Sequence, residues 1–454
     1  MKFKKNVYRI SMISVLFFLV SCADNQAVEK KLHQINQNPM SYIQPESLGI
    51  TQQEQTELVA DFLKNYFSPW DSARTLENSV KTLKDVQDNF KNFLENPGYS
   101  QKNQPIQKQF IETLQDNTDL VTYPNVNKFG IIVKGSLVRN LPTLLPSFGN
   151  SKIAGQGYPF DNLEVSYIEK GTPVQVLHAT KDRVWNLIHT ASYSGWVRSK
   201  QVGFVSQEFI LQWKMHPFVI TLRDHIPLLS KEKQVVASSR IGILYPMSAD
   251  QKDHYDVLLP MADDMNGNAQ IQTLLLDKKY THPFPVNISS KNVAAIAQTM
   301  IGTPYGWGGL HQQRDCSATT SDLFAAFGIW LPRNSLMQAK RGKIISLAKM
   351  TSEQKLQTIR KQGIPFFTLI HAPGHITLYI GIFNQDAYIL QDVWGVHTVN
   401  LFDKPGRAVI GKTVITPIDF GKGFFNVRET FLDKVDSMSI LIPSQKQRSV
   451  NPNS

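Results

Sequence analysis

The feature that most constrains this chain is the stretch GTPYGWGGLHQQRDCSATTSDLFAAFGIWLP at residues 302–332. It begins as a loop rich in glycine and aromatic residues, continues through Asp-Cys-Ser and ends in an amphipathic helical pattern. Asp315 is a favourable N-cap residue, and Gly328 is a favourable residue to end a helix. The pattern therefore predicts a helix that begins at Cys316 and buries its apolar face.

A thiol at the start of a helix has a specific chemistry. The positive end of the helix dipole is expected to lower the pKa of Cys316 and to favour the thiolate, which is the nucleophilic form. A nucleophile of this kind needs a base, and the base needs an orienting group. His375 opens a predicted strand, GHITLYIG at 374–381, and Gln391 lies with matching parity in the next one, YILQDVWG at 388–395. These residues are the candidate nucleophile, base and orienting amide.

Each of these residues also has a simpler interpretation. A single cysteine on a helix is most often a small core residue, and a histidine at the head of a strand is usually structural. The ordered set is what favours catalysis: a glycine-rich aromatic loop, a cysteine at a helix start, a histidine at a strand start and a polar residue in the next strand.

The only other cysteine, Cys22, ends a segment with the layout of a secretion signal. Residues 2–9 are basic, residues 10–20 are apolar, and LVSC follows at 19–22. This resembles a bacterial lipoprotein cleavage site, at which Cys22 is lipidated and attaches the protein to a membrane. Ala23 at the next position is typical of sorting to the periplasmic face of the outer membrane of a Gram-negative cell. A short uncleaved anchor is the alternative.

The rest of the chain divides into segments with different predicted secondary structure. Residues 51–96 have a helical pattern, and a third short helix is predicted near 105–116. Short strands separated by turns follow, at 165–168, 173–179, 184–190 and 194–198, and a second strand-rich block covers about 215–283. The net charge of +11 is scattered rather than blocked, which suits an acidic polymer or a membrane surface and disfavours nucleic acid. We expect no metal and no cofactor.

Several stretches together resemble the NlpC-type cysteine peptidases of bacterial cell walls, which have a papain-like fold. The matching stretches are TPYGWGG, DCS, LPRNSLMQ, GHITLYIG and ILQDVWG in the second half, with YFSPWD, GYPFDNLEVS and GWV upstream. The resemblance implies an α+β multidomain protein. The implied parts are a lipoprotein signal peptide (1–22), a tether (23–50), a helical stabilising region (51–122), two SH3-like β-barrels (123–212 and 213–285), a peptidase domain (286–435) and a flexible tail (436–454).

The resemblance also implies roles for single residues. Cys316 is the implied nucleophile and His375 the implied base, while Gln391 falls where many members have histidine. Tyr305 matches a loop tyrosine placed near the reacting carbonyl. Asp315 and Ser317 match a pair that reads the free amino end of the substrate.

The implied substrate is a peptidoglycan stem peptide with a free L-Ala amine, cut between γ-D-glutamate and a diamino acid. The first SH3-like barrel would wall one side of the cleft. Two alternatives stay open at this point. One is a peptidoglycan-binding lipoprotein without activity, and the other is a papain-like amidase or acyltransferase.

Overall fold

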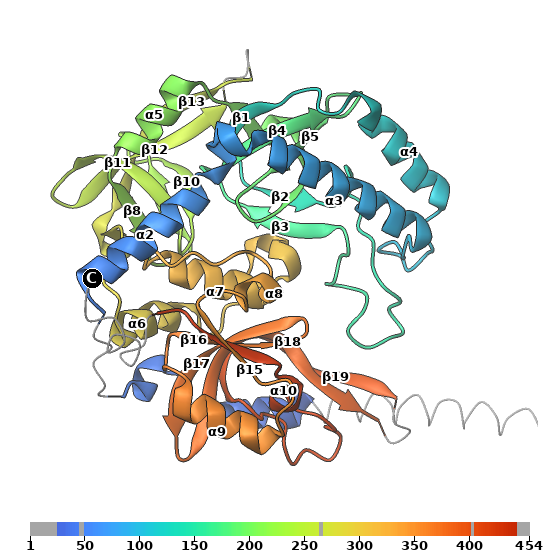
Figure 1. Ribbon diagram of the computed structural model, residues 1–454, viewed down its shortest axis with the longest axis vertical. Helices are drawn as coiled ribbons and strands as arrows, with labels where there is room; N and C mark the ends of the chain where they lie inside the picture. The colour runs from blue at the N-terminus through green and yellow to red at the C-terminus, as the bar shows by residue number, and fades with distance from the viewer. Residues whose placement is uncertain (1–24, 45–49, 263–266, 401–403, 443–454) are drawn as a thin grey trace, which may run out of the picture.

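The computed structural model describes residues 25–44, 50–262, 267–400 and 404–442. It has the predicted α+β multidomain architecture: N-terminal helices, two units of seven strands each and a C-terminal six-stranded sheet with helices (Figure 1). The two seven-stranded units lie at one end of the molecule and the six-stranded sheet at the other, with α7 (Cys316–Ala325) between them. The predicted signal peptide and Cys22 lie outside the described residues.

Three long helices follow the N-terminal segment: α2 (Gln52–Tyr66), α3 (Thr75–Glu95) and α4 (Lys108–Thr118). Helix α2 begins at a capping box formed by Thr51 and Glu54, and its predicted apolar face buries Phe62 in the largest core. Helices α3 and α4 pack their apolar faces against the first seven-stranded unit (Figure 1). The helical segment is thus attached to both ends of the molecule.

The first seven-stranded unit, called here the first barrel, contains β1–β7 in the order β3-β2-β6-β5-β4-β1-β7. Its strands are β1 (Lys128–Ile132), β2 (Ser136–Arg139), β3 (Glu164–Ile168), β4 (Pro173–Ala179), β5 (Trp185–His189), β6 (Ser194–Arg198) and β7 (Val202–Phe204). The four strands predicted here are confirmed within one residue at each end.

The second barrel contains β8–β14 in the order β10-β9-β13-β12-β11-β8-β14, and α5 (Gln207–Met215) joins it to the first. Its strands are β8 (Phe218–Thr221), β9 (Ile226–Leu229), β10 (Val235–Ser239), β11 (Leu244–Asp250), β12 (His254–Ala262), β13 (Ala269–Asp277) and β14 (Thr281–Pro283). Trp213 of α5 is buried between the two barrels, in a cluster with Ile131 and Leu258. This apolar contact fixes one barrel on the other.

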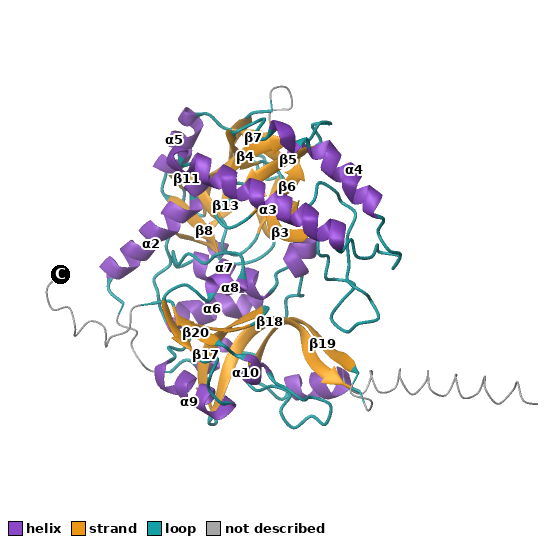
Figure 2. Cartoon of the chain, turned by 45° about the vertical axis from the view of Figure 1, so that its right-hand side comes forward, coloured by secondary structure: helices purple, strands orange, loops and turns teal. Residues whose placement is uncertain are grey.

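The C-terminal sheet has the order β15-β20-β16-β17-β18-β19 with antiparallel neighbours. Its strands are β15 (Lys343–Ser346), β16 (Thr368–Ala372), β17 (His375–Phe383), β18 (Asp386–Val399), β19 (Pro405–Pro417) and β20 (Ser437–Ile440). Helices α6 (Ser290–Met300), α7 and α8 (Ser335–Gln338) cover the face toward the barrels. Helices α9 (Ser352–Gln362) and α10 (Phe431–Lys434) cover the other face (Figure 2).

Two predicted segments differ from the structure. The predicted tether at 23–50 is wrong for residues 25–33, which are helical, because Val28 and Leu32 form an apolar stripe that packs on β19 and Phe420. The predicted flexible tail from 436 is wrong for β20, which pairs with β15 and β16 and buries Met438 and Ile440. The remainder of that tail lies outside the described residues.

Candidate active site

The glycine-rich loop before Cys316 allows the first barrel to approach the helix start closely. Gly308 and Gly309 have φ values of 60° and 96°, in the left-handed region that favours glycine. A Cβ on Gly308 would lie 2.7 Å from Cγ of Glu164, and one on Gly309 would lie 2.5 Å from the backbone nitrogen of Tyr167. Two glycines are therefore required where β3 lies against the loop.

Cys316 is the first residue of α7, and the Asp315 side chain caps the helix by accepting a hydrogen bond from the Ala318 N–H at 3.0 Å. This confirms the predicted helix start. The thiol is 8% exposed and receives a hydrogen bond from the backbone N–H of Ile376, the residue after His375. The expected lowering of the pKa is not found, because burial, with the neighbouring Asp315 charge, raises the pKa of Cys316 to about 12. The free site thus holds a neutral thiol.

His375 and Gln391 are in direct contact. His375 Nε2 lies 2.9 Å from Gln391 Oε1, and Gln391 Nε2 donates to Thr416 Oγ1 at 2.7 Å. Because the amide nitrogen is engaged with Thr416, its oxygen faces the ring, so Nε2 of His375 carries the proton and Nδ1 remains the acceptor. Burial lowers the pKa of His375, and the Phe431 ring packs edge-on at 5.4 Å between centroids. The arrangement holds a neutral imidazole in one tautomer.

Asp315 and Ser317 were expected to face a substrate amine, and the structure gives them another partner. Arg333 donates to both Asp315 oxygens, at 2.9 Å and 2.7 Å, and to Ser317 Oγ at 2.7 Å. Although burial opposes ionisation, the Arg333 charge and hydrogen bonds hold the pKa of Asp315 below its usual range. The Arg333 charge thus already balances that of the carboxylate, and the contact of Asp315 with a substrate amine stays a prediction. Arg333 lies in LPRNSLMQ, but nothing in that motif indicated its partner.

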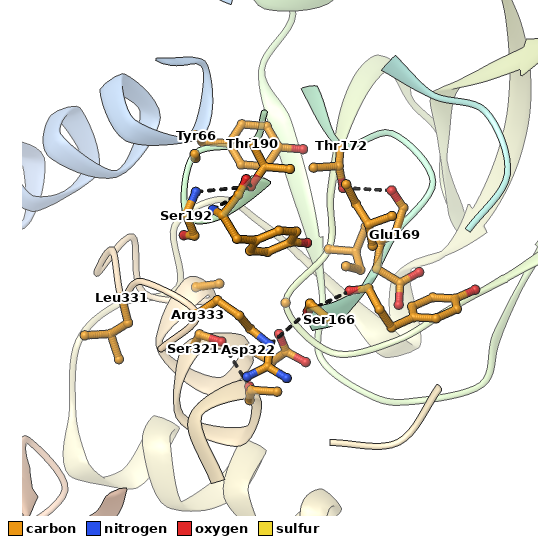
Figure 3. A pocket seen from close by; sticks show the side chains of 18 of the residues that line it. Tyr66, Ser166, Glu169, Thr172, Thr190, Ser192, Ser321, Asp322, Leu331 and Arg333 are labelled. Carbon is orange, nitrogen blue, oxygen red and sulfur yellow. Dashed lines mark hydrogen bonds between the residues drawn. The ribbon is translucent and has the colours of Figure 1, made fainter. Parts of the chain in front are cut away.

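Arg333 also joins the helix start to the first barrel. Its Nε donates to Ser166 Oγ of β3 at 2.9 Å (Figure 3). Ser166 and Arg333 lie on the wall of a cavity of about 170 Å³ between the barrels and α7, which Glu169 and Asp322 also line (Figure 3). The first barrel therefore contributes polar side chains directly behind the DCS motif.

Glu164, the first residue of β3, is another buried carboxylate near the loop, and it pairs with no arginine among the described residues. It is 7% exposed, and its Oε1 atom has no hydrogen-bond partner among the described residues. Burial and then the nearby Asp161 charge raise the pKa of Glu164 to about 8. Glu164 lies in the stretch NLEVS at 162–166, for which the sequence predicted no functional residue. An acid at the head of a barrel strand was the available signal.

Aromatic side chains from three segments line the approach to the loop. Tyr305 lies 6.0 Å from Trp394 between ring centroids, and Phe160 of the first barrel lies 5.3 Å from Trp307 and 5.7 Å from Trp394. Trp307 Nε1 also donates to the Asp161 carbonyl at 3.0 Å. Burial raises the pKa of Tyr305, so its hydroxyl stays a hydrogen-bond donor. The first barrel, the loop and β18 thus meet around Tyr305.

No group of three or more His, Cys, Asp or Glu residues is arranged to hold a metal ion within the described ranges. In the same part of the chain, no helix combines the length and apolar character needed to cross a membrane.

Four family models match the chain. Residues 302–402 match the NlpC/P60 family, and residues 11–123 match the N-terminal stabilising domain found with it. Residues 146–198 match an SH3 domain of the SH3b1 type, and residues 206–252 match one of the SH3b2 type.

Three known proteins are similar to this chain. A solved NlpC/P60 endopeptidase from Photobacterium damselae subsp. piscicida has a TM-score of 0.80 and 29% identity, over 90% of this chain and 98% of that one. Two γ-D-glutamyl-L-lysine dipeptidyl-peptidases also match. The Bacillus subtilis protein is 28% identical over 33% of this chain and 51% of its own length. The Bacillus cereus protein is 24% identical over 46% and 63%. The matched regions thus span between half and two thirds of the length of the two Bacillus proteins.

Proposed function

We propose a cell-wall cysteine endopeptidase, on the premise that residues 302–402 form an NlpC/P60 domain preceded by two bacterial SH3 domains. The proposed reaction is hydrolysis of the bond between γ-D-glutamate and the diamino acid of peptidoglycan stem peptides. The observation that carries the proposal is the His375–Gln391 pair beside a cysteine at a capped helix start. The activity of the two Bacillus relatives supports the choice of bond.

The proposed mechanism begins from a neutral pair, because burial raises the pKa of Cys316 and lowers that of His375. Cys316 Sγ attacks the γ-carbonyl carbon of D-glutamate while His375 Nδ1 takes the thiol proton. Backbone N–H groups at the start of α7 stabilise the oxyanion. His375 then protonates the leaving amine of the diamino acid, and water hydrolyses the thioester with His375 again as base. Gln391 holds the ring and does not titrate.

We further propose that the substrate carries a free L-Ala amine and that Glu164 receives it. The ammonium of the substrate needs a carboxylate partner, and the Asp315 carboxylate already accepts hydrogen bonds from Arg333. Glu164 is buried against the loop at Gly308 with one oxygen unpartnered, so it supplies the negative charge once it ionises. Tyr305 and the aromatic side chains around it supply the wall of the cleft.

The deciding experiment measures cleavage of L-Ala-γ-D-Glu-diaminopimelate by mass spectrometry. We expect Cys316→Ala and His375→Ala to lose at least about a thousandfold in kcat, since they remove the reacting groups. Gln391→Ala should lose less, and Gln391→His should retain activity. Wild-type protein that binds the peptide without cutting it would indicate a binding protein instead. Release of an acylated product in the presence of an added amine would indicate a transferase.

Lipidation of Cys22 and residence at the periplasmic face of the outer membrane are part of the same proposal, supported by the apolar run that ends in LVSC. Cys22→Ser should move the protein from the membrane fraction to the soluble fraction with its peptidase activity intact. A variant that stays with membranes after a carbonate wash would contradict lipidation as the anchor.

A further inference from the structure

Arg314, the residue directly before the DCS motif, extends its side chain to the second barrel. Its side chain is 3% exposed, and its two terminal nitrogens donate to the two Asp224 oxygens at 2.7 Å and 2.6 Å. A bidentate arginine–carboxylate pair fixes orientation as well as distance, and burial protects it from water and salt. The contact joins residues that are 90 positions apart.

Asp224 is itself held in place within the second barrel. It lies in the turn between β8 and β9, and the Ile241 backbone N–H donates to its Oδ1 at 3.1 Å. Although burial opposes ionisation, the hydrogen bonds and charge of Arg314 hold the pKa of Asp224 below its usual range. The carboxylate is therefore a fixed and charged anchor.

The same anchor reaches a later turn of α7. Arg314 Nε donates to Asp322 Oδ2 at 2.7 Å, and Arg240 of the second barrel donates to the same oxygen at 2.8 Å. Arg240 also pairs with Glu169 of the first barrel, with 3.0 Å between Nε and Oε1. Two arginines and three carboxylates thus connect both barrels to α7. Of these five residues, Glu169, Arg240 and Asp322 line the cavity shown in Figure 3.

The backbone of Arg314 extends this connection to the glycine-rich loop. Its carbonyl accepts a hydrogen bond from the Gly306 N–H at 2.6 Å, and Tyr305 forms a parallel bridge with it. The loop between these contacts contains two glycines with positive φ and packs against β3 at Glu164 and Tyr167. A change in the position of Arg314 would therefore move Cys316 on one side and Tyr305 on the other.

We propose that the second barrel positions the nucleophile, and that Arg314 and Asp224 are positioning residues that set the start of α7 from behind. The inference rests on the proposed function, in which Cys316 attacks the substrate. It assigns to the second barrel a role in catalysis that needs no contact with the substrate.

The test uses Asp224→Asn, which keeps the shape of the side chain and removes its charge. We expect kcat to fall about tenfold with KM changed less than twofold, as for a small misplacement of the nucleophile. Two readouts need no substrate. In a Cys22→Ser background, the rate at which iodoacetamide modifies Cys316 should change at least threefold, and hydrogen exchange at residues 306–318 should accelerate. Asp224→Glu, which restores the charge, should recover part of the kcat.

The matched control is Asp61→Asn. Asp61 of α2 pairs with Arg341 and also joins the C-terminal domain to another part of the molecule, but away from the DCS motif. The Asp61→Asn variant should have the same kcat, the same rate of Cys316 alkylation and the same hydrogen exchange at residues 306–318 as wild type. An Asp224→Asn protein that matches wild type in all three readouts would overturn the proposal, as would equal effects of the two variants. If wild type cuts no stem peptide, the proposed function fails, while alkylation and exchange still decide whether the anchor exists.

Discussion

The two barrels have the same number of strands but contact different residues around the start of α7. The first barrel brings Glu164 and Ser166 of β3 against the loop and Arg333, next to the DCS motif. The second barrel brings Asp224 and Arg240 against Arg314 and Asp322, behind the helix. The first barrel thus supplies polar groups next to the proposed catalytic residues, and the second barrel supplies charged groups that hold α7 in place.

The difference shows most clearly in the charge balance of the two contacts. Behind α7, each arginine is paired with carboxylates at 2.6–3.0 Å. On the cleft side, Arg333 neutralises Asp315, and Glu164 keeps an oxygen without a hydrogen-bond partner among the described residues. The ion pairs behind α7 balance one another's charges, although Arg240 Nε makes no hydrogen bond within the described residues. The unpartnered Glu164 carboxylate, by contrast, has a charge to offer to a ligand.

The largest expected effect that distinguishes the proposed roles of the two barrels is the loss of kcat/KM in Glu164→Gln. It removes the proposed partner of the substrate ammonium, so we expect kcat/KM for L-Ala-γ-D-Glu-diaminopimelate to fall about 30- to 100-fold, the value of a buried charge-assisted hydrogen bond. Cleavage of the N-acetylated peptide should stay as slow as in wild type. The measurement is cleavage of both peptides by wild type and variant.

Glu169→Gln is the matched variant, since Glu169 lies five residues further along and faces Arg240 behind α7. It should affect both peptides by the same factor, because it acts on the support. If the Glu164→Gln enzyme still cleaves the free-amine peptide faster than the N-acetylated peptide, Glu164 does not bind the substrate amine. The proposed difference between the two barrels would then be wrong.

The reactivity of Cys316 tests whether the packing of the barrels against the C-terminal domain keeps the thiol buried and protonated. With its pKa raised to about 12 by burial, Cys316 in a Cys22→Ser protein should react with iodoacetamide at least about tenfold slower than a free thiol at pH 7. The alkylation rate should increase with pH throughout the range 7–9. A rate above that of a free thiol would favour the helix dipole over burial.

The local features of the site follow from the sequence, because they depend on neighbouring residues. The start and cap of α7, the strand that begins at His375 and the matching parity of Gln391 were all predictable from periodicity and capping preferences. The glycines before Cys316 signalled an unusual loop, although only the structure shows that they admit Glu164 and Tyr167.

The electrostatic features were not predictable, because they depend on pairs that are distant in sequence. Arg333 reaches Asp315 across 18 positions, and Arg314 reaches Asp224 across 90. The pKa of Cys316 is raised rather than lowered because burial, and then the Asp315 charge, disfavour the thiolate, and burial is a property of the assembled domains. The helix at 25–33 was missed for the same reason, since its two buried residues need β19 to pack against.

The smallest expected effect is a change in how stability depends on pH. The pKa of Glu164 is raised to about 8 in the folded protein, chiefly by burial, from an ordinary value of 4.5. Between these values the unfolded chain releases the proton and the folded protein keeps it, so this group makes the free energy of unfolding fall as pH rises from about 5 to 8. Glu164→Gln cannot release a proton, and its stability should fall less over that range.

Because one pKa unit corresponds to about 1.4 kcal/mol, we expect the two proteins to differ in this fall by at least about 1 kcal/mol. Urea unfolding at pH 5 and pH 8 measures the difference, and Asp61→Asn should behave as wild type. Parallel curves for wild type and Glu164→Gln would mean that Glu164 is already ionised in the free protein. A free-amine substrate would then meet a carboxylate that is already charged, so ionisation of Glu164 would contribute no rise of kcat/KM between pH 6 and 8.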